Sequence, residues 1–154
     1  MRRKDKEITD EVQIRGILER GKVCRVAFFD EEYPYMVPLC FGFDGRALYF
    51  HGFNGGKKIE CLRKNPKVCF EVDEDIEVVQ DPDPCEWTMK YRSVVGFGTA
   101  VFLEGTEEKR EGLNHVVKQY AGRELPFPDQ AMASIAVVRI DIESMTGRRN
   151  GYTL

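Results

Sequence analysis

The sequence predicts one α+β domain, built mainly on antiparallel β-strands with flanking helices. The 154 residues are enough for a single domain with a sizeable core and too few for two. Apolar residues make up 42% of the chain and charged residues 32%, which is typical of globular proteins. Most strand-like segments follow one another through short turns. We therefore expect residues 1–154 to form a small antiparallel barrel that closes its own sheet edges.

The first third of the chain predicts a helix followed by hairpin-linked strands. A helix is expected between Thr9 or Asp10 and Gly21, because the apolar residues of this segment recur at helical spacing. Asp44-Gly45 separates two apolar runs and is a strong hairpin signal. The strands expected here are residues 23–29, 35–43 and 47–52.

The rest of the chain alternates strands with two further helices. Asn65-Pro66 ends the first of these helices, Thr106 caps the second and Gly122 ends it. The acidic, proline-containing segment 73–87 shows no clear period, so we expect a strand end and a long loop there. The helices are expected at 57–66 and 106–122, and the strands at 67–75, 91–105 and 134–147.

Composition and charge exclude several classes of function. The net charge is −3, which gives no basic field for nucleic acid or an anionic membrane surface. No apolar run approaches the roughly 18 residues of a membrane span, and the basic N-terminus has no apolar export segment behind it. The five cysteines and two histidines show no metal-binding spacing. We therefore expect a cytoplasmic protein without a metal site.

The turn Gly55-Gly56-Lys57-Lys58 lies between a strand and a helix. Glycines let backbone N–H groups point at one place, and the helix start and two lysines add positive charge. These features favour a phosphate or a similar anion. A flexible turn followed by solvated lysines is the alternative that the motif leaves open.

The two histidines differ in their predicted surroundings. His51 ends the strand 47–52, four residues before the glycine turn, and imidazole titrates near neutral pH. It is therefore either a general acid or base or a hydrogen-bonded residue at a strand end. His115 lies outside the apolar stripe of its helix and is expected on the surface.

Pro38 and the glycines of residues 91–105 are unusual inside strands. Proline cannot donate a ladder hydrogen bond, so Pro38 implies an edge strand, a bulge, or a neighbour such as a flat ligand. Gly96 and Gly98 leave one face of their strand without side chains, which makes room for a packed neighbour or for a ligand.

Several stretches together resemble a known family over residues 5–148. The chain is similar to the 5-nitroimidazole resistance branch of the pyridoxamine 5'-phosphate oxidase-like flavoproteins. The stretches are "PYMVPLCFGF", "LYFHG", "GGKKIECLRKNPKVCFEVD", "CEWTMKYRSVVGFGTA" and "RIDIESMTG".

The resemblance implies a six-stranded split β-barrel, a homodimer, and flavin mononucleotide (FMN) at the subunit interface. It implies that the strand 36–39 runs beside the flavin ring, that Lys57 and Lys58 hold the phosphate, and that Thr146 comes from the partner subunit. The cofactor-binding residues implied are Met36, Val37, Pro38, Leu39, Tyr49, Phe50, His51, Gly52, Gly56, Lys57, Lys58, Arg92, Ser93 and Thr146.

The resemblance also implies an activity. The nitroimidazole resistance proteins look like reductases of nitro groups, and His51 matches their functional histidine, although Gly52 replaces the usual serine. The oxidase itself pairs Arg with Lys where this chain has Gly56-Lys57, and its C-terminal arginine clamp is absent, which disfavours pyridoxamine phosphate as substrate. We expect an FMN-dependent oxidoreductase of small molecules with His51 as catalytic residue and a nicotinamide cofactor as electron donor. The alternatives are a non-catalytic flavin-binding or sensing protein, and a protein that binds haem or a deazaflavin.

Overall fold

The computed structural model describes residues 3–152, in which eight strands form one antiparallel sheet. The ends of the predicted domain, residues 1–2 and 153–154, lie outside the described residues. The strands are β1 (Glu7–Ile8), β2 (Cys24–Phe28), β3 (Tyr35–Leu39), β4 (Gly42–Phe43), β5 (Ala47–Phe53), β6 (Lys67–Val79), β7 (Thr88–Leu103) and β8 (Ile135–Asn150).

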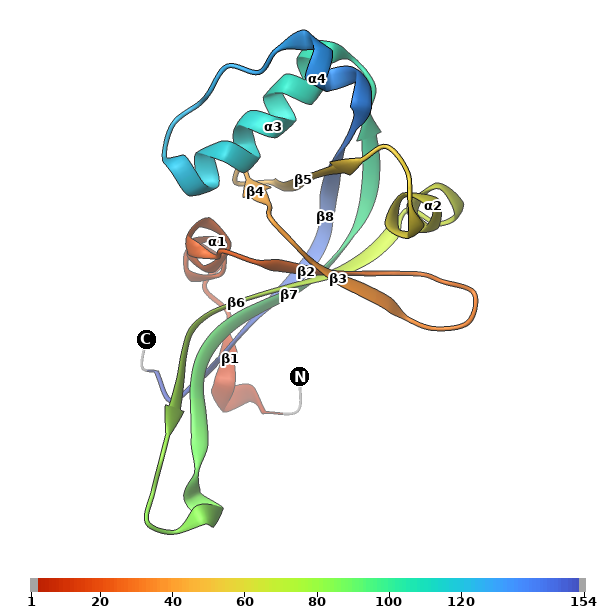
Figure 1. Ribbon diagram of the computed structural model, residues 1–154. Helices are drawn as coiled ribbons and strands as arrows, with labels where there is room; N and C mark the ends of the chain where they lie inside the picture. Colours follow the sequence, from red (N-terminus) through yellow and green to blue (C-terminus); the bar gives the residue numbers. More distant parts are fainter. Residues whose placement is uncertain (1–2, 153–154) are drawn as a thin grey trace.

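α3 and α4 lie at one end of the sheet, and α1 and α2 lie on either side of its middle, as Figure 1 shows. No helix among residues 3–152 is long and apolar enough to cross a membrane. The α-helices are α1 (Glu11–Arg20), α2 (Lys57–Lys64), α3 (Thr106–Ala121) and α4 (Asp129–Ser134), and two short 3-10 helices are η1 (Lys4–Lys6) and η2 (Pro84–Glu86).

The strand order is β3-β2-β6-β7-β8-β5-β4, with β1 added to β8. The prediction of an antiparallel α+β fold is confirmed, and the prediction of six strands is wrong. β1 has two residues, too few to show a period of two in the sequence, and β4 is the end of the predicted strand 35–43, which Cys40 and Phe41 divide in two. The ladder ends at β3 on one side and β4 on the other, so its hydrogen bonds do not show the predicted closure of a barrel.

The predicted helices form, and one more was missed. Asp10 caps α1 by accepting a hydrogen bond from the N–H of Val12 at 2.9 Å, and Gly122 ends α3 in the left-handed conformation. Thr106, expected as a cap, is instead the first residue of α3. The missed helix, α4, has six residues and follows a proline-containing segment, so it was too short to show a helical stripe.

β6 continues to Val79 and β7 begins at Thr88, so the predicted strand 67–75 is longer than expected and the loop expected within 73–87 is shorter. β6 and β7 pair as far as Val79 and Thr88 and form a long hairpin that extends beyond the rest of the sheet (Figure 1). A β-bulge between Glu74 and Glu77 adds one residue to β6, with Asp75 at a φ of +54°. This irregularity interrupts the period of two on which the sequence prediction depended.

Two apolar cores hold the helices against the sheet. The larger lies under α1 and α2 and includes Phe41, Phe50 and Phe70. The smaller lies between α3, α4 and the opposite face of β5 and β8, around Val137. Gly96 faces the larger core, where an added Cβ would lie 2.2 Å from the ring of Phe70. Of the two explanations for the strand glycines, packing is therefore the one that the structure supports at Gly96.

Candidate functional site

The turn between β5 and α2 leaves the start of a helix open. Gly56 has a φ of +87° and is the N-cap of α2, but no side chain caps the helix there. The N–H groups of Ile59 and Glu60 both donate to the carbonyl oxygen of Gly56. The first N–H groups of a helix have no partner within the helix, so this end can accept an anion.

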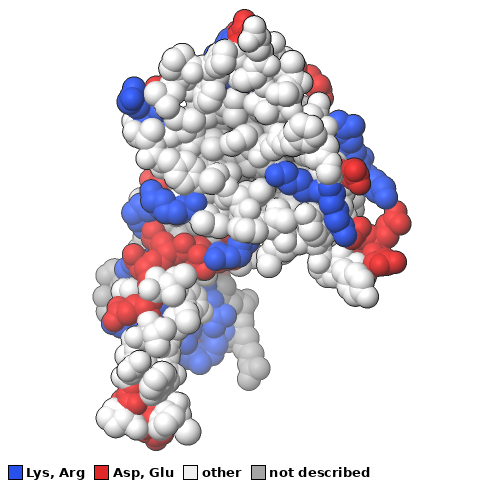
Figure 2. Space-filling view, viewed as in Figure 1, with Lys and Arg blue, Asp and Glu red and all other residues white. Residues whose placement is uncertain are grey.

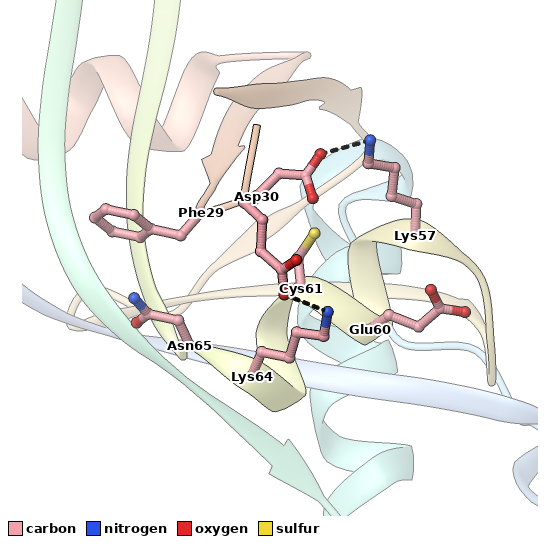
Figure 3. A pocket seen from close by; sticks show the side chains of 8 residues that line it. Phe29, Asp30, Lys57, Glu60, Cys61, Lys64 and Asn65 are labelled. Atoms are coloured by element: carbon pink, nitrogen blue, oxygen red, sulfur yellow. Dashed lines mark hydrogen bonds and ion pairs between the residues drawn. The ribbon is translucent and has the colours of Figure 1, made fainter. Parts of the chain in front are cut away.

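Lys57 is held by the loop that joins β2 to β3. Its Nζ lies 2.6 Å from Oδ2 of Asp30 and 5.1 Å from the centre of the Tyr35 ring. About two helical turns further on, Lys64 pairs with Glu31 at 2.9 Å. Figure 3 shows both pairs on the two sides of a hollow of about 440 Å3 between the loop and α2.

Lys58 points elsewhere, back over the end of β5. A Cβ added to Gly52 would lie 2.7 Å from both Cε and Nζ of Lys58, so this side chain occupies the space next to the glycine. The side chain is half-buried, and burial alone lowers the pKa of its ammonium group. Lys58 forms no ion pair with another residue in the range 3–152.

His51 lies beside Lys58. Partial burial and the charge of Lys58 both lower the pKa of the imidazole, burial being the larger cause. The ring is nevertheless exposed to solvent. A neutral imidazole next to an ammonium group can accept a proton from one molecule and donate it to another.

The strand β3 presents a row of backbone and side-chain groups to solvent. Among the described strands it pairs only with β2 and is therefore an edge strand, which is where a proline without an N–H donor is tolerated. Val37 and Leu39 turn toward the core, whereas Met36 and Pro38 are exposed on the other face. The contact of Lys57 with the Tyr35 ring places the start of α2 beside this strand.

Tyr49 and Phe50 are buried, so their side chains do not line an open site. Phe50 lies in the larger core and is 1% exposed. The hydroxyl of Tyr49 donates to Oδ2 of Asp44 at 2.8 Å, and its ring stacks on His115 with centres 4.5 Å apart. His115 is half-buried, which corrects its prediction as a surface residue, because its ring packs against Tyr49 on β5.

Arg92, Ser93 and Thr146 lie far from these groups within one chain. His51 pairs with Val137 on β8, and Val137 pairs with Leu103 on β7. Ten residues then separate Leu103 from Ser93, which is roughly 33 Å of strand at about 3.3 Å per residue. One chain therefore does not bring the predicted residues into one site.

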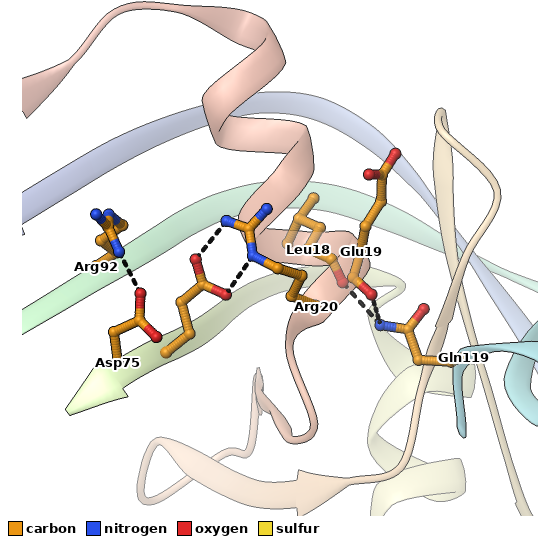
Figure 4. Close-up of polar contacts among 7 residues, drawn as sticks. Leu18, Glu19, Arg20, Asp75, Arg92 and Gln119 are labelled. Carbon is orange, nitrogen blue, oxygen red and sulfur yellow. Dashed lines mark hydrogen bonds and ion pairs between the residues drawn. The ribbon is translucent and has the colours of Figure 1, made fainter. Parts of the chain in front are cut away.

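Arg92 also points away from its neighbour Ser93, because successive strand residues face opposite sides. Its guanidinium group pairs with Asp75 and lies 4.3 Å from the centre of the Tyr152 ring. Figure 4 shows the pair with Asp75 close to the ion pair between Arg20 and Glu74. These contacts indicate a structural role for Arg92 at the base of the β6–β7 hairpin.

The sequence predicted the lysines as candidate ligands, but it did not predict the acidic residues that pair with lysines of α2. Asp30 and Glu31 belong to the turn "DEEYP", and nothing in its local pattern says that it lies against α2. The run of three acidic residues next to a tyrosine was the sequence feature that could have indicated this contact with the lysines. No cluster of metal-binding side chains occurs in the described part of the chain.

Comparisons with known proteins match this fold. A family model described as pyridoxamine 5'-phosphate oxidase matches residues 10–149. An uncharacterised protein of Rhizobium meliloti is 32% identical over 62 residues, a match that spans 40% of this chain and 40% of that protein.

Solved structures align over most of the chain. A candidate 5-nitroimidazole antibiotic resistance protein of Bacteroides thetaiotaomicron is 30% identical, covers 93% of this chain and 86% of its own, and has a TM-score of 0.83. An FAD-binding protein of Mesorhizobium loti is 26% identical, with coverages of 92% and 96% and a TM-score of 0.67. A flavocytochrome of Azotobacter vinelandii shares the fold at 20% identity, with coverages of 99% and 72% and a TM-score of 0.84.

Proposed function

Because this chain belongs to the pyridoxamine 5'-phosphate oxidase family, a family of flavin-binding proteins, we propose that it binds FMN and transfers electrons to small molecules, nitro compounds among them. The observation that carries the proposal is the ammonium group of Lys58, which has no ion-pair partner within residues 3–152, at the open start of α2. The ammonium group and the helix N–H groups suit a phosphate monoester. The 5-nitroimidazole resistance protein at 30% identity supports the choice of substrate.

The chain's own groups fit the parts of FMN. Gly56 leaves room at the phosphate end, since an added Cβ there meets nothing within 4 Å, and Gly52 makes room for the side chain of Lys58. The exposed side of β3 at Met36 and Pro38 offers a flat, uncharged surface for the flavin ring. When bound, FMN supplies the electrons, and His51 holds or delivers the proton that accompanies them.

The same proposal assigns two copies of the chain to each site. Pro38 and Thr146 lie on one face and in one row across the sheet, because Pro38 pairs with Arg25, Arg25 with Glu71, Glu71 with Val95, and Val95 with Thr146. Four strand spacings of about 4.8 Å separate these two residues within one chain. A second copy facing this side of the sheet would supply Ser93 and Thr146 to the first copy's site.

The first experiment is to record the absorption spectrum of the purified protein and to titrate it with FMN. Reduced nicotinamide cofactor is then added with and without a nitroaromatic acceptor. We expect a flavin spectrum, bleaching on reduction, and reoxidation that depends on the acceptor. Bleaching without such reoxidation would favour a flavin sensor, and a haem or deazaflavin spectrum would assign another cofactor.

The phosphate site is tested by comparing FMN with riboflavin, which lacks the phosphate. Losing a charge-assisted hydrogen bond costs about 1.5–3 kcal/mol, so Lys58→Ala should weaken FMN binding by roughly 10- to 100-fold. Riboflavin binding should change little. Lys64→Ala, which removes a lysine at the other end of α2, is the matched control and should leave the preference for FMN unchanged.

A further inference from the structure

The loop between β2 and β3 is acidic and lies against the basic helix α2. We call residues 29–34 the β2–β3 loop; its acidic residues are Asp30, Glu31 and Glu32. The basic residues of α2 are Lys57, Lys58, Arg63 and Lys64. Figure 2 shows acidic and basic groups next to one another at the right of the molecule, where Figure 1 places this loop and α2.

Two ion pairs join the loop to the helix, and they differ in exposure. Asp30 and Lys57 lie 2.6 Å apart, and the side chain of Asp30 is 23% exposed. Glu31 and Lys64 lie 2.9 Å apart, but their side chains are 80% and 69% exposed. Exposed pairs contribute little to stability, because solvent screens the two charges. The pair between Asp30 and Lys57 is therefore the contact that fixes the loop on α2.

The ammonium group of Lys57 is directed at Asp30, as Figure 3 shows. Hydrogen bonding to Lys57 lowers the pKa of Asp30, and hydrogen bonding to Asp30 raises the pKa of Lys57. Both groups are therefore charged at neutral pH. Lys58, the next residue, lies over Gly52 and has no acidic partner in the range 3–152.

A phosphate at the start of α2 would compete with Asp30 for Lys57. A carboxylate and a phosphate monoester are both oxygen anions that accept hydrogen bonds from an ammonium group. A phosphate within reach of the Lys57 Nζ would lie close to the carboxylate of Asp30, because that carboxylate is 2.6 Å from the same nitrogen. Two anions so close together repel each other. Binding of one anion to Lys57 therefore weakens binding of the other.

We propose that Asp30 occupies the place of the cofactor phosphate on Lys57, and that FMN displaces it and so releases the β2–β3 loop from α2. The inference rests on the phosphate site of the proposed function and adds a residue that opposes binding there. A phosphate monoester carries a charge of about −1.5 to −2 at neutral pH, so it can displace a single carboxylate. Riboflavin has no phosphate and leaves the pair between Asp30 and Lys57 intact. Asp30 thus makes the position of the loop depend on the phosphate of the cofactor.

The hollow between the loop and α2 contains a thiol that reports on this change. Phe29, Asp30 and Glu31 of the loop line one side of the hollow, and Glu60 and Cys61 of α2 line the other. The sulfur atom of Cys61 points toward Asp30 (Figure 3), and the residue is only 4% exposed. Release of the loop should therefore expose this thiol to reagents in solution.

The first test compares Asp30→Asn with Glu31→Gln in the full-length protein. Each variant removes one negative charge from the loop and keeps the shape of the side chain, but only Asp30 pairs with Lys57. Asp30→Asn should tighten FMN binding roughly three- to tenfold, because Lys57 is then free for the phosphate. Riboflavin binding should stay unchanged. Glu31→Gln should leave both affinities within about twofold of the wild type.

The other results of this titration have distinct meanings. Weaker FMN binding by Asp30→Asn would overturn the inference, because Asp30 would then position Lys57 for the phosphate. An unchanged affinity would also overturn it, since the two anions would not compete. A wild-type protein that binds FMN and riboflavin equally would remove the phosphate site itself, and one that binds no flavin would overturn the proposed function as well.

The second test measures release of the loop by pulse alkylation with iodoacetamide, quantified at Cys61 by peptide mass spectrometry. FMN should raise the labelling rate of Cys61 several-fold, and riboflavin should not. Asp30→Asn should raise this rate without any ligand, whereas Glu31→Gln, which changes the same hollow, should not. Cys24, which is 1% exposed at the other end of β2, is the internal control and should keep its rate.

Two labelling results would overturn the release of the loop. If FMN leaves the rate at Cys61 unchanged or lowers it, the loop stays closed in the complex. If Cys24 and Cys61 both react faster, the fold loosens as a whole and the loop has no separate motion. FMN binding that depends on the phosphate would leave the proposed function standing in either case.

Discussion

At the scale of single residues, Gly52 and Lys58 depend on each other. Lys58 occupies the space that a side chain at Gly52 would need, and it has no carboxylate partner in residues 3–152. Lys57, its neighbour in sequence, is instead paired with Asp30. The two lysines that the sequence offered as equal phosphate ligands therefore have different surroundings, and Lys58 is the one available to an anion.

We expect Gly52→Ala to weaken FMN binding by displacing Lys58. Its Cβ would lie 2.7 Å from the flexible end of that side chain, which can move without disturbing the backbone. Stability should therefore change by less than about 1 kcal/mol. Gly55→Ala is the matched control, because its Cβ would meet only Phe53 at 3.8 Å. Titration calorimetry with FMN and urea unfolding separate the two effects; equal FMN affinities would contradict the role of Gly52.

His51 should lose its proton at a lower pH than an unperturbed histidine. Burial and Lys58 lower its pKa, so the folded state resists protonation. The unfolded chain takes up the proton first, and the free energy of unfolding therefore decreases as the pH falls through about 6.5. An NMR titration of the imidazole should give a midpoint below about 6.5, which rises in Lys58→Ala. An unchanged midpoint in that variant would mean that the two groups do not interact.

At the scale of elements, β7 combines packing and recognition on its two faces. Its inward glycines admit neighbouring groups, as at Gly96, where the ring of Phe70 fills the space of a side chain. Its outward residues, such as Phe97, remain exposed. One strand thus stabilises the core and presents a surface for contact.

Gly96→Ala should destabilise the protein by about 1–3 kcal/mol, since it overpacks the core against Phe70. Adding Phe70→Leu should relieve the clash, so the double variant should lose less stability than the sum of the single changes. Urea unfolding of the four proteins gives this coupling. Additive losses would indicate that Gly96 is constrained by something other than the ring.

The elements that the sequence predicted well are those with a clear period and clear ends. Asp10 and Gly21 bound α1, and Asp44-Gly45 forms the turn between β4 and β5, as predicted. The misses have physical reasons. The bulge at Asp75 breaks the period of β6, and Cys40 and Phe41 separate β3 from β4 in a run that looked continuous.

The candidate site was predictable in part. The glycine turn, the lysines and His51 are neighbours in sequence, and the fold keeps them together. The pairing of Lys57 with Asp30 depends on contacts between distant segments, which local patterns do not encode. The separation of Ser93 and Thr146 from His51 likewise appears only when the strand registers are known.

At the scale of the whole molecule, the proposed site is built from two copies of the chain. A site that uses Lys58 from one copy and Thr146 from the other can be tested by complementation. Lys58→Glu and Thr146→Glu should each abolish FMN binding when present in both copies. Mixed dimers of the two variants would contain one intact site.

Random pairing after coexpression should therefore restore about one quarter of the wild-type sites. The measurement is FMN bound per chain after purification of the mixture. No recovery in a demonstrated mixed dimer would mean that each site is built from a single chain, or that Thr146 has no part in it.

The position of β8 has a consequence for how the chain is made. β8 lies between β7 and β5 and also pairs with β1, yet it leaves the ribosome after all of these strands. Until then, β7 and β5 each lack a neighbour along one edge, and unpaired edges invite aggregation. The sheet can therefore become one unit only after β8 has been made, and until then its strands can pair only as two separate sets, β3-β2-β6-β7 and β5-β4.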